Sequence, residues 1–125
     1  MMCVKTVIKS SEIHGIGLFA DEDIQEGQII WKFNPLVDLV LSEEQLESLH
    51  PVCRERIEYY SFKTNDGRYV LVCDDNRFIN YSSDPNVQDV ADIESPSIAK
   101  RFIPKGEELT TDYCFDFGKE SRNMR

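Results

Sequence analysis

The most informative segment of the chain is Arg77-Phe78-Ile79-Asn80-Tyr81-Ser82-Ser83-Asp84-Pro85-Asn86. Pro85 bends the chain there, so the polar segment 80–86 is not expected to form an ordinary strand. The asparagines at its two ends offer amide donors and carbonyl acceptors at fixed geometry, which suits an amino-acid-like ligand. A turn held by its own backbone explains the same residues, and composition alone favours that turn.

Two further clusters lie on either side of this stretch. Gly15-Ile16-Gly17 falls in a polar loop, where glycines let the backbone approach a ligand closely. The third glycine and the long helix of a dinucleotide-binding loop are missing, which excludes such a loop, and the cluster alone favours an ordinary turn. Residues 108–113 end an expected strand with an acid beside Tyr113. A tyrosine hydroxyl can orient a nucleophile, but Tyr113 could equally be packed in the core.

Short period-two patterns with one or two helices predict a mainly β domain. Strands are expected over residues 3–9, 17–20, 28–33, 60–63, 69–73, 97–102 and 108–115. Ser42 and Gln45 form a capping box that begins one helix, which Pro51 limits. Residues 52–60 are expected to form a second short helix, and Asn65-Asp66-Gly67 predicts a hairpin turn.

A weak internal repeat relates two distant segments of the chain. Ala20-x3-Ile24-x2-Gly27-x2-Ile30 matches Ala99-x3-Ile103-x2-Gly106-x2-Leu109. Each copy has the pattern of a strand, a tight turn and a strand. We interpret the repeat as two hairpins that share turn chemistry by chance.

Length and charge restrict the class of protein. The 125 residues suit one domain, and 14 basic against 23 acidic residues give a net charge of −9. This balance disfavours direct nucleic-acid binding and would attract a basic partner, but charge alone is explained more simply by an acidic surface that keeps the protein soluble. No apolar run is long enough to span a membrane or serve as a signal peptide, so we expect an intracellular protein, cytoplasmic or nuclear. The four cysteines are scattered, which indicates reduced thiols.

In this order, the three clusters resemble the motifs of the SET-domain family, and the resemblance covers residues 4–118. The matching segments are Gly15–Ala20 with Asp23–Gly27, Arg77–Asn86 and Gly106–Tyr113. The resemblance implies a β-clip-like fold of small curved sheets, with one or two short helices and a C-terminal strand threaded as a pseudoknot beneath the central motif. It also implies a single SET domain over residues 1–125, with a variable insert at 36–75 and a polar tail at 119–125.

The resemblance implies a function as well. The expected activity is methyl transfer from S-adenosylmethionine to a lysine side chain of a basic protein, histone-like or ribosomal. The implied cofactor-binding residues are Gly15, Ile16, Gly17, Asn80 and Tyr81. Tyr113 is implied as the catalytic residue that aligns the amine, and Thr111 and Phe115 are implied to line the substrate channel.

Departures from the family pattern keep alternatives open. Tyr81 stands where the family has histidine, so a catalytically inactive module that binds cofactor or peptide is the main alternative. A β-rich interaction domain without a cofactor is another. Ser83 replaces a cysteine that binds zinc in some relatives, so no metal is expected. Thr111 is smaller than the Phe or Tyr of several members, which leaves room for di- or trimethyl-lysine unless Asp89 or a tyrosine from the 59–69 region fills it.

Overall fold

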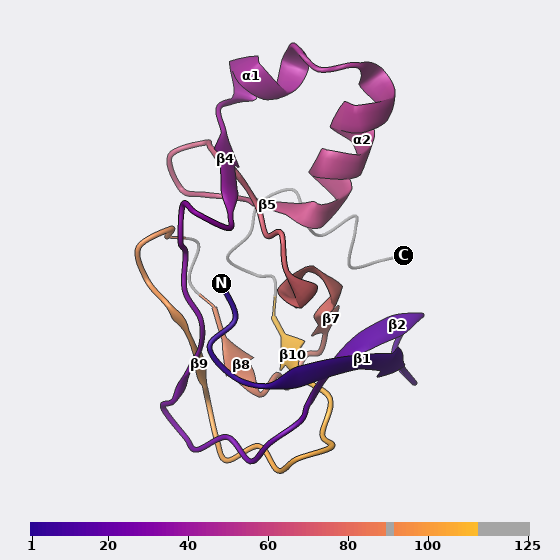
Figure 1. Ribbon diagram of the computed structural model, residues 1–125, viewed down its shortest axis with the longest axis vertical. Coiled ribbons are helices and arrows are strands. Elements are labelled where there is room, and N and C mark those ends of the chain that lie inside the picture. Colours follow the sequence, from indigo (N-terminus) through magenta and orange to yellow (C-terminus); the bar gives the residue numbers. More distant parts are fainter. Residues whose placement is uncertain (90–91, 113–125) are drawn as a thin grey trace.

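The computed structural model describes residues 1–89 and 92–112, and they confirm a mainly β fold built from small sheets. The strand orders are β1-β2, β3-β9-β8-β10-β7 and β4-β6-β5. The strands are β1 Thr6–Ser10, β2 Ile16–Ala20, β3 Ile29–Trp31, β4 Leu39–Leu41, β5 Ser61–Lys63, β6 Tyr69–Leu71, β7 Asn80–Tyr81, β8 Val87–Gln88, β9 Ser97–Ala99 and β10 Thr110–Thr111. The helices are α1 Glu43–Glu47, α2 Pro51–Tyr60 and the 3₁₀ turn η1 Asp75–Phe78. Figure 1 shows α1 and α2 at one end of the molecule, away from the β1–β2 hairpin.

The central motif departs from the sequence prediction at its start. Asn80–Tyr81 forms β7, although residues 80–86 were not expected to form a strand, and that part of the prediction is wrong. The partner that makes this strand possible is β10, which pairs with β7 in parallel and comes from the far end of the described chain. The short strands β4 and β8 were not predicted either, because two or three residues carry too little periodicity.

The crossing of β10 is the feature that sets the topology. β10 lies between β7 and β8 and runs parallel to both. Residues 82–86 therefore carry the chain from one flanking strand to the other across β10 (Figure 1). The buried Asn86 side chain fixes this crossing, since its Oδ1 accepts from Thr110 N at 2.8 Å and its Nδ2 donates to Glu108 O at 2.8 Å. This is the pseudoknot that the resemblance implies.

The two copies of the internal repeat pair with each other. Gly27 N donates to Ala99 O at 2.8 Å, and Gly106 N donates to Ala20 O at 2.8 Å. Both glycines have positive φ, 82° and 95°, a backbone conformation that other residues rarely adopt. Each copy thus offers the same groups to the other, and the interpretation of the repeat as chance turn chemistry is wrong.

The main hydrophobic core forms where these copies meet. Ile24 and Ile103 exchange two backbone hydrogen bonds of 2.8 Å, and both side chains are 0% exposed. The buried members of this core are Val4, Leu18, Ala20, Ile24, Ile30, Ile79, Val87, Ala99, Ile103 and Leu109. They come from both ends of the chain, so this single core holds the strands of the central motif in place.

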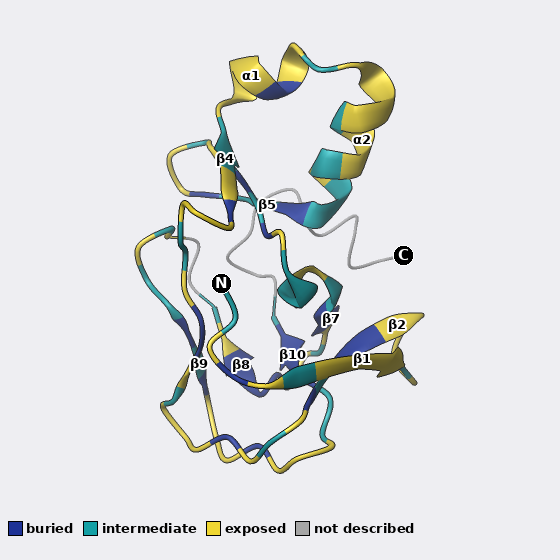
Figure 2. Cartoon of the chain, viewed as in Figure 1, coloured by how far each residue is buried: buried dark blue, intermediate teal, exposed yellow. Residues whose placement is uncertain are grey.

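Residues 36–75, which the sequence predicts to be a variable insert, contain both α-helices of the described chain and the separate sheet β4-β6-β5. The capping box of α1 is confirmed, because Ser42 Oγ accepts from Gln45 N at 3.0 Å and Gln45 Oε1 accepts from Ser42 N at 2.9 Å. Pro51 is the first residue of α2, a position where its missing N–H leaves no bond unmade. The helix contains no buried residue, and Figure 2 shows most of its surface as exposed. The insert therefore presents α2 to the solvent.

The predicted hairpin of the insert is confirmed. β5 and β6 pair antiparallel, and Gly67 takes a φ of 86° in the turn between them. The Arg68 guanidinium hydrogen bonds to the Asp66 carboxylate and, with help from the Thr64 hydroxyl, lowers the pKa of Asp66 to about 2. The turn is thus fixed by side chains as well as by the glycine.

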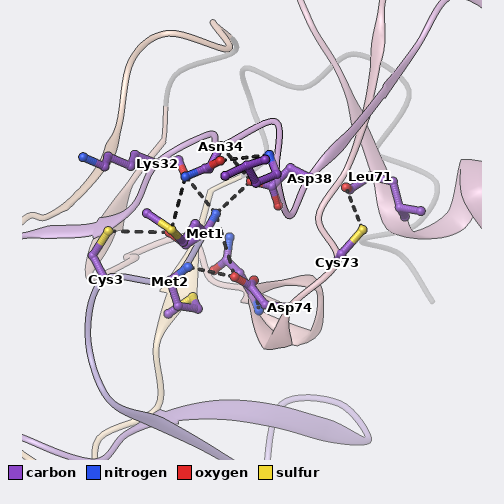
Figure 3. Close-up of polar contacts among 11 residues, drawn as sticks. Met1, Met2, Cys3, Lys32, Asn34, Asp38, Leu71, Cys73 and Asp74 are labelled. Atoms are coloured by element: carbon purple, nitrogen blue, oxygen red, sulfur yellow. Dashed lines mark hydrogen bonds and ion pairs between the residues drawn. The ribbon is translucent and has the colours of Figure 1, made fainter.

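The N-terminal segment holds both ends of the insert (Figure 3). The Met1 ammonium donates to Asp38 Oδ2 at 2.9 Å and to Lys32 O at 2.8 Å. Met2 N donates to Asp74 Oδ2 at 2.7 Å. Asp38 and Asp74 lie near the beginning and the end of the insert, so these contacts anchor it to the core. Among the described residues, no helix is long and apolar enough to cross a membrane.

Candidate active site

Asn80 brings the three sequence motifs together. The side chain is 3% exposed, and its Nδ2 lies 3.0 Å from His14 O and 3.2 Å from Ile16 O in the glycine loop. The same nitrogen lies 3.0 Å from Glu108 Oε2 of the last motif. One amide group carries only two hydrogens, so these acceptors share them. The central motif is therefore joined to both of the others at a single atom.

Ser11 and Glu108 complete this junction. Ser11 Oγ donates to the Glu108 carboxylate, at 2.8 Å to Oε1 and 2.9 Å to Oε2, and also lies 3.2 Å from Asn80 Nδ2. Ser11 Oγ accepts from Ile13 N at 2.9 Å, so it shapes the start of the glycine loop. We call Ser11, Asn80 and Glu108 the motif junction. Ser11 and Glu108 were not named as site residues, because their spacing in the chain does not reveal the contact.

Gly17 is required by the close packing of the motif junction. A Cβ at this position would lie 2.4 Å from Glu108 Oε2 and 2.9 Å from Ser11 Cβ. Gly15, in contrast, has a φ of 47°, and no atom lies within 4 Å of a Cβ built there. The lack of a side chain at Gly17 therefore lets the segments that carry Ser11 and Glu108 pack closely against it, while Gly15 faces open space.

Gly17→Ala should lower the free energy of unfolding by about 1–3 kcal/mol. The Glu108 side chain can swing away from the new methyl group, but it then loses its hydrogen bonds to Ser11 and Asn80. Urea unfolding of Gly17→Ala, Glu108→Ala and the double variant measures the coupling. If the contact with Glu108 causes the loss, Gly17→Ala lowers the free energy of unfolding by less when Glu108 has already been replaced by alanine. Fully additive losses would contradict this account.

The remaining cofactor candidates lie beside the motif junction. Ile16 begins β2 with its side chain 52% exposed, and Tyr81 is 38% exposed on β7. β7 is the outermost strand of its sheet in the order of the described strands. The side-chain hydrogen bonds found between Asn80 and other described residues all use Nδ2, and none uses Oδ1. An ammonium donor could therefore be received by Asn80 Oδ1.

Thr111 is placed on β10 with its side chain fully buried. Its hydroxyl donates a hydrogen bond to Asp89 Oδ2, and the other Asp89 oxygen accepts a hydrogen bond from Ser97. The space beside Thr111 is thus taken up on one side by a carboxylate, one of the two possibilities that the sequence left open. Tyr113 and Phe115 lie outside the described residues.

The described residues contain no group of three or more His, Cys, Asp or Glu side chains that could hold a metal ion. The cysteines that the structure describes, Cys3, Cys53 and Cys73, are free and exposed. That the protein needs no metal therefore stays a prediction.

The chain belongs to the SET-domain family, whose match covers residues 15–114. Histone-lysine N-methyltransferase 2D of Homo sapiens is 31% identical over 123 residues, which is 91% of this chain and 2% of that protein. Putative histone-lysine N-methyltransferase ASHH4 of Arabidopsis thaliana is 33% identical over 129 residues, which is 93% of this chain and 35% of that protein. The chain thus spans only 2% to 35% of the length of these curated relatives.

Solved structures share the fold. Chaetomium thermophilum Polycomb Repressive Complex 2 bound to GSK126 has a TM-score of 0.71 at 24% identity, covering 97% of this chain and 17% of that chain. The Neurospora SET domain protein DIM-5, a histone lysine methyltransferase, has a TM-score of 0.63 at 24% identity. The match covers 90% of this chain and 53% of that chain. The Chaetomium complex in an autoinhibited conformation bound to S-adenosylmethionine has a TM-score of 0.67 at 24% identity. The match covers 89% of this chain and 15% of that chain.

Proposed function

We propose that this chain is a protein-lysine methyltransferase that takes its methyl group from S-adenosylmethionine. The observation that carries the proposal is the motif junction, in which Asn80 links the glycine loop to the last motif through hydrogen bonds of 3.0–3.2 Å. The named activity of the relatives supports the same reaction class.

The residues beside the motif junction fit the amino-acid part of this cofactor. Asn80 Oδ1 is available to accept from an ammonium, and the position above Gly15 is open to a ligand. We propose that Gly15, Ile16, Gly17, Asn80 and Tyr81 form the cofactor-binding site. The bound cofactor supplies an activated methyl group, and the protein supplies the position and orientation of the reactants.

The substrate amine must be neutral to accept a methyl group. Free lysine has a pKa of about 10.4, so only about one amine in 10³ is neutral near pH 7. A channel that excludes water favours the neutral amine. We propose that Thr111 and Phe115 line such a channel and that Tyr113 aligns the amine. No strong base is needed, since water can take the released proton.

The proposed substrate is a lysine of a basic protein. The net charge of −9 attracts a basic partner and repels nucleic acid. Because the relatives are named histone-lysine methyltransferases, a histone is the first candidate, with a ribosomal protein as the second. A histone substrate would place the protein in the nucleus.

Two measurements together test the proposal. Added S-adenosylmethionine should raise the unfolding temperature, because a ligand that binds only the folded state stabilises it. Labelled methyl groups should then pass from the cofactor to lysines of purified histones. Stabilisation without transfer to histones or ribosomal proteins would favour the inactive binding module that Tyr81 suggests. If S-adenosylmethionine does not stabilise the protein and no methyl transfer is detected, the proposal is rejected.

Tyr113→Phe should keep the affinity for S-adenosylmethionine and lose about nine-tenths of the turnover. A hydrogen bond that only aligns the amine contributes about 1–1.5 kcal/mol to the transition state, which corresponds to about tenfold in rate. Calorimetry measures the affinity, and labelled methyl transfer measures the rate. Equal turnover in Tyr113→Phe and the unaltered protein would show that the Tyr113 hydroxyl does not align the amine.

A further inference from the structure

Asp66 and Gly67 stand next to each other in the turn between β5 and β6, and this pair of residues has a chemistry of its own. A backbone nitrogen can attack the side-chain carboxyl of the aspartate before it. Glycine hinders this attack least, because it has no Cβ. The Asp66 side chain is 58% exposed, so water reaches it freely. The turn therefore contains both groups that such a reaction needs.

The reaction alters the covalent backbone and needs only water. The Gly67 nitrogen bonds to Cγ of Asp66, and the hydroxyl of that carboxyl leaves with the amide proton as water. A second water then opens the cyclic imide at either of its carbonyls. Opening at Cγ restores aspartate. Opening at the main-chain carbonyl gives isoaspartate, in which the backbone runs through Cβ and Cγ.

Arg68 holds the Asp66 carboxyl in its unreactive, ionised form. Arg68 Nη2 lies 2.8 Å from Asp66 Oδ2, and Nε lies 2.9 Å from the same oxygen and 3.1 Å from Oδ1. These hydrogen bonds, with that of the Thr64 hydroxyl, lower the pKa of Asp66 from 3.8 to about 2. A carboxylate has no hydroxyl to release. The reactive neutral form is therefore about ten- to a hundredfold scarcer near neutral pH than in a free aspartate.

The attacking nitrogen is restrained as well. Gly67 N donates to Thr64 O at 3.1 Å, and Thr64 N donates to Arg68 O at 2.8 Å, which closes the turn. The Thr64 hydroxyl donates to Asp66 Oδ1 from an anchored position, since Thr64 is only 4% exposed. Reacting atoms must meet in one orientation at about 3–3.5 Å. Attack on Asp66 therefore requires the hydrogen bond of Gly67 and the hold on the carboxylate to break.

We propose that Asp66 and Gly67 form a latent site of isoaspartate formation, and that Arg68 and Thr64 suppress the reaction by holding the carboxylate. This assignment does not depend on the proposed methyl transfer. Isoaspartate adds a backbone atom to a turn whose flanking residues, Lys63 and Tyr69, are paired in register. Because β6 also pairs with β4, the modification would disturb the whole sheet of the insert.

The rate of isoaspartate formation in the folded and the unfolded chain tests the proposal. The unaltered protein is incubated near pH 5, where a free aspartate is still partly neutral, with and without guanidinium chloride. Peptide mapping by mass spectrometry and chromatography measures succinimide and isoaspartate at Asp66. The folded protein should react at least about tenfold more slowly than the unfolded chain. Equal rates would overturn the proposal.

Arg68→Ala and Thr64→Val separate the hold on the carboxylate from the rigidity of the fold. Folded Arg68→Ala should form isoaspartate about tenfold faster than the unaltered protein, and Thr64→Val should do so by a smaller factor, because Arg68 lowers the pKa of Asp66 most. Arg56→Ala is the matched control, since it removes an exposed arginine of α2 with the same change in net charge. Thermal melts establish which variants are folded. Unchanged rates in both Arg68→Ala and Thr64→Val would overturn the proposal.

Discussion

Asn80→Ala should weaken S-adenosylmethionine binding about a hundredfold, which corresponds to about 3 kcal/mol of binding free energy. The substitution removes the proposed acceptor for the cofactor ammonium, a hydrogen bond to a charged group. It also releases the glycine loop, because Asn80 Nδ2 no longer reaches His14 O or Ile16 O. Both losses act on the same ligand, so the effect exceeds that of one hydrogen bond.

Isothermal titration with S-adenosylmethionine measures this effect. Asn65→Ala is the matched control, since Asn65 is an exposed asparagine in the hairpin turn far from the motif junction. A thermal melt without cofactor should show that Asn80→Ala still folds. If Asn80→Ala binds as tightly as Asn65→Ala, Asn80 does not hold the cofactor.

Asn86→Ala should lower the free energy of unfolding by about 3 kcal/mol. The side chain is 2% exposed, and its removal leaves the buried Thr110 N–H and the Glu108 carbonyl without their 2.8 Å partners. Each unsatisfied buried group costs roughly 1–3 kcal/mol. Because both groups belong to the segment that crosses between β7 and β8, the pseudoknot itself is weakened.

Urea unfolding of Asn86→Ala against Asn65→Ala measures this loss. The midpoint should fall while the slope with urea stays the same, as expected for a change in stability alone. A loss below about 1 kcal/mol would show that the crossing is held by packing more than by this side chain.

Local patterns in the sequence predicted the parts of the fold that depend on neighbours. The capping box of Ser42 and Gln45 is confirmed because both partners lie within one helical turn. The Asn65–Gly67 hairpin is confirmed for the same reason. The ordered motifs gave the SET-domain fold, since together they span most of the chain.

Most contacts between residues far apart in the chain were not predicted by the local sequence patterns. The strand at Asn80–Tyr81 depends on β10, and the motif junction joins Ser11 to Glu108. Neither contact leaves a period or a spacing in the sequence. The internal repeat did carry such a signal, and the reciprocal bonds of Gly27 and Gly106 show that identical turn residues in two copies can mark mutual pairing.

The reciprocal pairing also constrains the order of events during protein synthesis. Ile24 leaves the ribosome early, but its partner Ile103 emerges only near the end of the described chain. Until then, the core residues of the first copy of the repeat lack the second copy, against which they pack in the folded protein. Contacts of such long sequence separation make folding slow, since a large loop must close before they form. The nascent domain therefore exposes apolar surface that is prone to aggregation until its second copy of the repeat has been translated.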